Sequence, residues 1–298
     1  MSEPKKKLRL KRKLFLTLLY TVVIFAFVKA FQIFFQFPQV DVLKSSFPVM
    51  KFTDIKTPVK VVWEKEKPKA WLDIQKLPKR VYGAFIVSED WEFFNHRGFD
   101  YNQIQESILE DLKTGTFKRG GSTITQQLVK NLYLEQEKSL LRKYKELVLS
   151  TELEERFPKM TILETYLNVV EMGVGIYGLT AAAQLYFKKT PYNLTAKEAA
   201  FVAMLLPSPK RYSVSYRKRE LTRYARGTIN NILRKMKAGG FISEETMNVE
   251  LESPLSFEKI VPVVTPEEAT QEMPLDETVQ DENKSAENKD KSIDQPEE

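Results

Sequence analysis

The chain has 298 residues, of which 42% are hydrophobic, so it is long enough for one or two domains with a sizeable core. It holds no cysteine and one histidine, which excludes disulfides and thiol catalysis and argues against a structural zinc site. The net charge is +6, but residues 262–298 carry three lysines and twelve acidic residues, a net of −9, which leaves +15 on residues 1–261. A basic body suits a phosphorylated substrate or an anionic membrane surface.

The N-terminus combines a basic cluster with a long apolar run. Seven lysines and arginines lie between Lys5 and Lys13, and residues 14–37 are apolar except for five positions. The apolar run is long enough to cross a bilayer. A cleavable signal peptide is the alternative, but no small-residue cleavage site follows. The positive-inside rule predicts that residues 1–13 stay in the cytoplasm and that the chain after about residue 37 lies outside.

Composition divides the rest of the chain. Prolines interrupt the segment after the apolar run, where residues 59–63 are the one strand candidate. Helical periodicity begins near Ile74, and the acidic end of the chain has no aromatic residue with which to build a core. The expected division is a cytoplasmic basic segment at 1–13, a transmembrane helix at 14–37, a juxtamembrane connecting segment at 38–74, a mainly α-helical domain at 75–257 and a disordered acidic tail at 258–298.

The stretch Ser88 to Asp100, S-E-D-W-E-F-F-N-H-R-G-F-D, places two carboxylates and the only histidine among aromatic residues. The phenylalanines of this stretch could wall one side of Glu89. An apolar wall disfavours the charged carboxylate, so Glu89 could act as a base near neutral pH. The alternative is that Ser88 caps a helix whose positive N-terminus favours Glu89 and Asp90, with His96 a structural residue.

A second stretch, G-G-S-T-I-T-Q-Q-L-V-K-N at 120–131, predicts a loop followed by an amphipathic helix. Thr123 and Gln126 have the spacing of a capping box. On the helix Thr123, Gln127 and Asn131 share one stripe, with Lys130 beside it. This face would suit a sugar or a phosphate, although an ordinary capped helix with a solvated polar face has the same pattern.

Two further clusters follow. In L-R-K-Y-K-E-L, Arg142 and Glu146 are four residues apart and could form an exposed salt bridge, but the basic-to-acidic order is the weaker one for a helix. Two cations and a carboxylate that face a site are the alternative interpretation. In K-M-T-I-L-E-T-Y-L-N, Thr161 and Glu164 have capping-box spacing ahead of a core stripe.

Together and in this order, the four motifs resemble those of the peptidoglycan glycosyltransferases. That family has a lysozyme-like fold and occurs in class A penicillin-binding proteins and as monofunctional membrane enzymes. The resemblance covers residues 75–245, and G-V-G-I-Y-G-L-T-A-A-A-Q-L-Y-F-K looks like the monofunctional branch. The family's fifth motif has paired arginines where this chain offers only Arg226, so no role is assigned to it. The resemblance implies a mainly α, lysozyme-like domain preceded by one transmembrane helix.

The resemblance also implies a reaction. Family members polymerise lipid II: the 4-hydroxyl of one molecule attacks C1 of the lipid-pyrophosphate-linked glycan, with inversion to a β-1,4 bond. Glu89 would be the general base, and Glu146 would assist pyrophosphate departure or bind a divalent cation, Mg or Mn, although no cofactor is certain. The implied substrate-binding residues are Ser122, Thr123, Gln127, Lys130, Asn131, Arg142 and Lys143, and the supporting residues are Asp90, Phe93, His96 and Glu164.

The implied partners are lipid II, the growing glycan strand, the plasma membrane and other cell-wall synthesis or division proteins, with no nucleic acid. Residues 99–117 would correspond to a mobile segment over the donor groove. Two alternatives stay open: a lysozyme-like enzyme that cleaves glycan, and a catalytically weak scaffold of a cell-wall assembly. The basic R-K-x-x-E cluster favours a phosphorylated donor over the hydrolase, and the presence of Glu89 and Glu146 argues against the scaffold.

Overall fold

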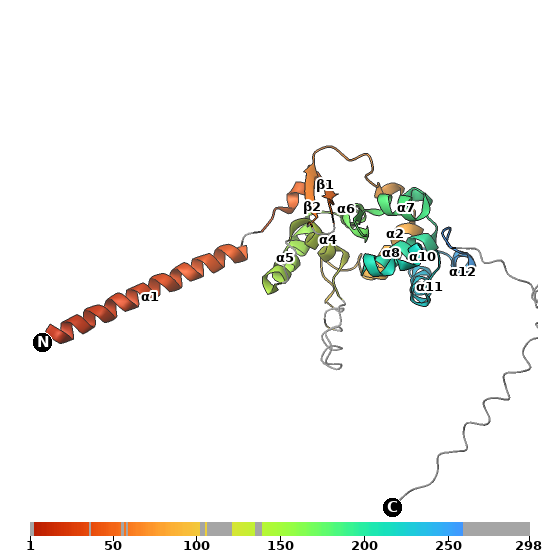
Figure 1. The fold of residues 1–298 in the computed structure, drawn as a ribbon. Coiled ribbons are helices and arrows are strands. Elements are labelled where there is room, and N and C mark those ends of the chain that lie inside the picture. The colour runs from red at the N-terminus through yellow and green to blue at the C-terminus, as the bar shows by residue number, and fades with distance from the viewer. Residues whose placement is uncertain are drawn as a thin grey trace, which may run out of the picture. The chain divides into compact units, whose positions relative to one another are not determined.

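The computed structural model describes residues 3–35, 37–54, 57, 59–101, 105, 121–134 and 139–258, all within the compact unit Met1–Glu258. Most of the predicted mobile segment at 99–117, and the acidic tail beyond residue 258, lie outside these residues. Helices dominate (Figure 1), which confirms the mainly α prediction. The longer helices are α1 (Glu3–Phe35), α2 (Lys79–Glu89), α4 (Ile124–Tyr133), α5 (Leu140–Arg156), α6 (Lys159–Val169), α7 (Leu179–Phe187), α8 (Ala196–Leu205), α11 (Arg223–Ala238) and α12 (Glu244–Glu252).

The shorter elements connect these helices. The strands are β1 (Phe47–Lys51), β2 (Lys60–Glu64), β3 (Glu171–Gly173) and β4 (Ile176–Tyr177), paired antiparallel as β1 with β2 and β3 with β4. The remaining short helices are η1 (Val40–Lys44), η2 (Ile74–Lys76), η3 (Pro191–Asn193), α9 (Pro209–Tyr212) and α10 (Val214–Lys218).

Helix α1 contains the predicted membrane span. Its segment Arg12–Gln32 has 21 residues with a mean hydropathy of 2.2, and none of it is buried against the rest of the protein. A helix of this length and composition is able to cross a bilayer. The unburied apolar surface therefore suggests a membrane anchor.

The core forms around α8, all ten residues of which are buried. A helix that is apolar on nearly every side is stable only when other elements surround it. Helices α2 and α11 pack directly against α8 (Figure 1), while α4 packs against α5 and α6 in a second group. The C-terminal end of α2 leads toward the N-terminal end of α4, so residues near this junction come from both groups.

The segment predicted to be a mere connection, residues 38–74, takes part in the fold. Strand β2 lies at the predicted strand. Its partner β1 was not predicted, because Pro48 falls within it and a proline argues against a strand unless the strand lies at the edge of a sheet, as β1 does. The segment also buries Val40, Leu72 and Ile74 in the core. The proposed domain limits stay a prediction, with this segment contributing to the folded body.

The two predicted capping boxes have different outcomes. Thr123 and Gln126 form one at the start of α4, as predicted. Helix α6 instead begins after Pro158 without a side-chain cap, so the prediction for Thr161 and Glu164 was wrong. The Glu164 carboxylate points away from its own helix end and accepts hydrogen bonds from Trp71 Nε1 at 2.8 Å and from the Ile74 amide at 3.0 Å. Glu164 thus ties the segment before α2 to α6.

Replacing Glu164 by alanine should therefore destabilise the fold. Two donors in the partly buried segment before α2 would lose their acceptor, which costs about 1–3 kcal/mol of unfolding free energy. Urea unfolding followed by circular dichroism measures the change. Glu155→Ala is the matched control, because Glu155 lies exposed on α5, and it should change the free energy by less than about 0.5 kcal/mol. Equal effects of the two substitutions would contradict this role for Glu164.

Candidate active site

Glu89 is the last residue of α2, and Asp90 caps that helix at its C-terminal end. The alternative in which Ser88 starts a helix is therefore wrong. The negative end of a helix disfavours a carboxylate, the opposite of what a helix start would do. Glu89 is only partly exposed, and burial raises its pKa from the ordinary value, against the hydrogen bonds from Gln127 and Ser88. The wall of phenylalanines is smaller than predicted, because Phe93 is buried but Phe94 is 47% exposed.

Gln127 on α4 holds the Glu89 carboxylate in place. Its Nε2 donates to Glu89 Oε2 at 2.9 Å, and its Oε1 accepts from the Tyr166 hydroxyl at 3.1 Å. Tyr166 is fully buried on α6, where desolvation raises its pKa well above the ordinary value. Three helices thus meet at one amide group, and Gln127 links the predicted base to the core.

Asp90 and His96 fix the loop that follows Glu89. The buried Asp90 carboxylate accepts from His96 Nε2 at 2.9 Å and from the Ile124 amide at 2.9 Å, at the start of α4. At the far end of the loop, Gly98 adopts φ +93°, and a Cβ there would lie 2.8 Å from the Ser150 carbonyl carbon, so only glycine fits. This geometry favours a supporting role for Asp90 and His96.

Thr123 differs from the prediction that it binds substrate. Its side chain is buried, and its hydroxyl donates to the Gly98 carbonyl at 2.7 Å while accepting from the Gln126 amide at 3.1 Å. Its hydroxyl is thereby committed to the capping box and the loop. Ser122, by contrast, is exposed beside it. The geometry leaves Ser122 available for a ligand and gives Thr123 a structural function.

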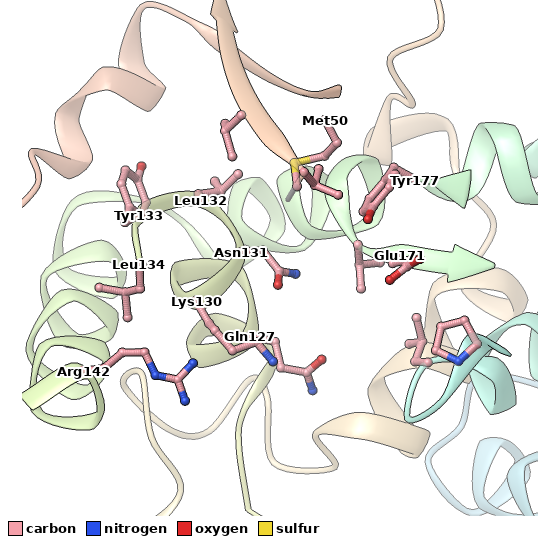
Figure 2. A pocket seen from close by; sticks show the side chains of 15 residues that line it. Met50, Gln127, Lys130, Asn131, Leu132, Tyr133, Leu134, Arg142, Glu171 and Tyr177 are labelled. Carbon is pink, nitrogen blue, oxygen red and sulfur yellow. The ribbon is translucent and has the colours of Figure 1, made fainter. Parts of the chain in front are cut away.

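A cleft of about 610 Å³ lies along α4. Figure 2 shows Gln127, Lys130 and Arg142 on one side of this main cleft, with Glu171 and Tyr177 from β3 and β4 opposite. Its full lining is Met50, Val59, Val61, Gln127, Lys130, Asn131, Leu132, Tyr133, Leu134, Arg142, Val170, Glu171, Tyr177, Leu206 and Pro209. Four predicted binding residues, Gln127, Lys130, Asn131 and Arg142, therefore share one surface. The sequence did not predict Glu171 and Tyr177, which belong to the hairpin of β3 and β4, because only the fold brings this hairpin close to α4.

Cations dominate one part of the main cleft. Partial desolvation lowers the pKa of Lys130, which the charges of Glu146 and Glu89 oppose and those of Arg142 and Lys143 reinforce. The Arg142 Nε is buried and has no hydrogen-bond partner among the residues that the structure describes. An anion in the cleft would place a counter-charge beside both groups.

Glu146 is buried on α5 and forms its ion pair with Lys143. The predicted alternative, an exposed pair between Arg142 and Glu146, was wrong, because the Lys143 side chain reaches the carboxylate instead. Among the described residues no group of three or more acidic or histidine side chains could hold a metal ion. A divalent cation at Glu146 would have to displace Lys143, so these side chains do not by themselves fit a metal site.

Comparisons with known proteins show the family of the chain. The family model described as Transglycosylase matches residues 56–237. The chain belongs to the transglycosylase family. It is 39% identical over 190 residues to "Penicillin-binding protein 1A" of Aquifex aeolicus, an alignment that covers 63% of this chain and 26% of that protein.

Two relatives are named "Biosynthetic peptidoglycan transglycosylase". The protein of Acinetobacter baumannii is 41% identical over 165 residues, covering 53% of this chain and 73% of its own. That of Thiobacillus denitrificans is 42% identical over 142 residues, covering 48% and 61%. The chain thus spans about a quarter of the Aquifex protein and between three fifths and three quarters of the two proteins named transglycosylase. Glu89, Gln127, Lys130, Arg142 and Glu146 all lie within the part that the family model matches.

The raised pKa of Glu89 predicts a pH-dependent stability. Since its folded-state pKa lies above the ordinary value of 4.5, the neutral carboxyl favours folding at low pH, and this contribution is lost as the pH rises through the raised pKa. Glutamine stays neutral throughout. We expect Glu89→Gln to match the wild-type melting temperature at about pH 4 and to exceed it at about pH 8. Calorimetry measures the difference, and Glu155→Gln serves as the exposed control. Parallel pH dependence in all three proteins would contradict the assignment.

Proposed function

We propose that this transglycosylase polymerises lipid II into β-1,4-linked glycan strands of peptidoglycan. The observation that carries the proposal is a desolvated carboxylate bonded to a side chain that also lines a cationic cleft. Gln127 contacts Glu89 and, one helical turn further along α4, Lys130 lies on the same side of the cleft as Arg142 (Figure 2). Such a site offers a base for a sugar hydroxyl and cations for a pyrophosphate, the two requirements of the reaction.

In the proposed reaction Glu89 removes the proton from the 4-hydroxyl of the incoming lipid II. The resulting oxygen attacks C1 of the donor glycan from the face opposite the leaving group, so a β-1,4 bond forms as the bond from C1 to the pyrophosphate oxygen breaks. The pyrophosphate leaves with the bonding electrons. Lys130 and Arg142 stabilise the charge that develops on it, and Lys143, paired with Glu146, lies exposed beside them. Ser122 and Asn131 offer hydrogen bonds to the sugars.

The membrane anchor gives this reaction its place. Seven cations precede the apolar segment of α1, so the positive-inside rule puts the N-terminus in the cytoplasm and the catalytic body on the outer face of the plasma membrane. The substrate is itself membrane-bound there. Association with other cell-wall synthesis or division proteins remains a prediction of the family resemblance. The same holds for a divalent cation, which Glu146 would hold only if Lys143 moved away from its carboxylate.

Replacing the base tests the chemistry directly. Glu89→Gln keeps the size of the side chain and its bond to Gln127 but removes the basic oxygen. The rate of polymer formation from labelled lipid II, measured with the detergent-solubilised full chain, should fall at least about a hundredfold. Glu146→Gln should also lower it, while Glu155→Gln should not. Full activity in the Glu89 variant would overturn the mechanism, and cleavage of finished glycan without polymer formation would point to a hydrolase.

Replacing the cleft cations tests donor binding. Lys130→Ala and Arg142→Ala each remove a charged partner of the pyrophosphate, so KM for lipid II should rise or kcat/KM should fall about tenfold to a hundredfold. Arg234→Ala on α11 removes an exposed cation that does not line the cleft. If all three variants behaved alike, general electrostatic attraction would explain the effect better than a defined pyrophosphate site.

A further inference from the structure

Tyr166 has a buried hydroxyl for which the proposed mechanism has no use. It lies on α6 in the fourth motif, its side chain is fully buried, and it does not line the main cleft. Its hydroxyl donates to Gln127 Oε1 at 3.1 Å. Because burial and the charges of Glu89 and Asp90 raise its pKa, the phenol keeps its proton at physiological pH and remains a donor. Any influence of this hydroxyl on substrate must therefore pass through Gln127.

The bond from Tyr166 supports the observed orientation of the Gln127 amide, which the acceptor-only carboxylate of a charged Glu89 also requires. An amide oxygen that accepts from the phenol turns the Nε2 group toward Glu89, where it donates to Oε2 at 2.9 Å. A second, longer contact of 3.5 Å runs from Nε2 to the Ser122 carbonyl. The reversed amide would place its oxygen against the carboxylate and its N–H groups against the phenol. The observed orientation is thus the one that supports a charged Glu89.

The two oxygens of Glu89 are consequently not equivalent. Oε2 accepts the short bond from Gln127, whereas Oε1 has only a 3.5 Å contact from the Ser88 hydroxyl among the residues described. We propose that Tyr166 and Gln127 are positioning residues that hold Oε2 and leave Oε1 as the oxygen that takes the proton from the sugar hydroxyl. This inference rests on the proposed function, and it assigns Gln127 to the base in addition to the substrate.

The sign of the effect follows from the groups around Glu89. The charge of Asp90 raises the pKa of Glu89, and that of Lys130 lowers it together with the bonds from Gln127 and Ser88. The buried Tyr166 phenol is neutral. Removing its hydroxyl frees the amide to turn, which weakens the donation to Oε2 and moves the pKa of Glu89 upward. The base then stays protonated up to a higher pH than in the wild-type protein.

The variant Tyr166→Phe tests the positioning of Glu89, and Tyr186→Phe is the matched control for the loss of a buried tyrosine hydroxyl. Tyr186 is also buried, but its hydroxyl donates to the Met172 carbonyl at 2.9 Å. In Tyr166→Phe the acidic limb of the profile of kcat against pH should move to higher pH. On that limb kcat at a given pH should fall about tenfold and recover at higher pH, with KM for lipid II unchanged. Tyr186→Phe should change kcat by the same factor at every pH and leave the position of the acidic limb unchanged. An unshifted limb in Tyr166→Phe would overturn the proposal.

A second measurement is independent of polymerisation. A hydrophobic carbodiimide modifies carboxyl groups in their protonated form, so mass spectrometry of the Glu89 peptide across pH reports the protonation of this residue, and Glu89→Gln gives the blank. The midpoint should move upward in Tyr166→Phe and in Gln127→Met, and stay at the wild-type value in Tyr186→Phe. If the wild-type protein makes no polymer but the variants show these shifts, the proposed function is wrong and the positioning of Glu89 by Tyr166 and Gln127 is supported. Identical midpoints in all variants would show that Tyr166 and Gln127 do not position Glu89.

Discussion

The Asp90 carboxylate carries the constraint on which the candidate site depends. By accepting from the first amide of α4 and from His96, it joins the end of α2 to the start of α4. A buried carboxylate needs such donors, and a helix N-terminus supplies them together with a favourable field. Glu89, the neighbouring residue, is thereby brought to Gln127. Two adjacent carboxylates thus have different environments: Asp90 accepts short bonds from buried donors, whereas one oxygen of Glu89 has, among the described residues, only the 3.5 Å contact from Ser88.

The sequence predicted the composition of the site better than its internal contacts. The motifs named Glu89, Gln127, Lys130 and Arg142, and helical periodicity placed the last three on helices. Whether Glu89 began or ended a helix could not be read from the window, because acidic residues occur at both ends of helices. The contact that fixes the next residue, from the Ile124 amide to the Asp90 carboxylate, spans 34 positions. Local spacing likewise suggested a pair between Arg142 and Glu146, although rotamers and burial selected Lys143.

Tyr166 shows why part of the site could not be predicted from the sequence. Its spacing with neighbouring apolar residues predicts a core position, and it is indeed fully buried. Periodicity describes where a side chain points, not what its polar atom meets, and here the hydroxyl meets a residue 39 positions away. A buried tyrosine needs a partner for its hydroxyl, so the sequence could have raised the question. Only the packing of α6 against α4 answers it.

Lys130 connects the two halves of the proposed chemistry. Its charge lowers the pKa of Glu89, while the charges of Glu89 and Glu146 raise its own. A pyrophosphate bound at Lys130 and Arg142 would neutralise much of this positive field. The pKa of Glu89 would then rise, because less cationic charge would favour its ionised form. Glu89 would thus become a stronger base when a donor occupies the cleft, provided that the bond from Gln127 keeps it ionised. Donor binding and base strength would thus be coupled through Lys130, and the bond from Gln127 to Glu89 would limit that coupling.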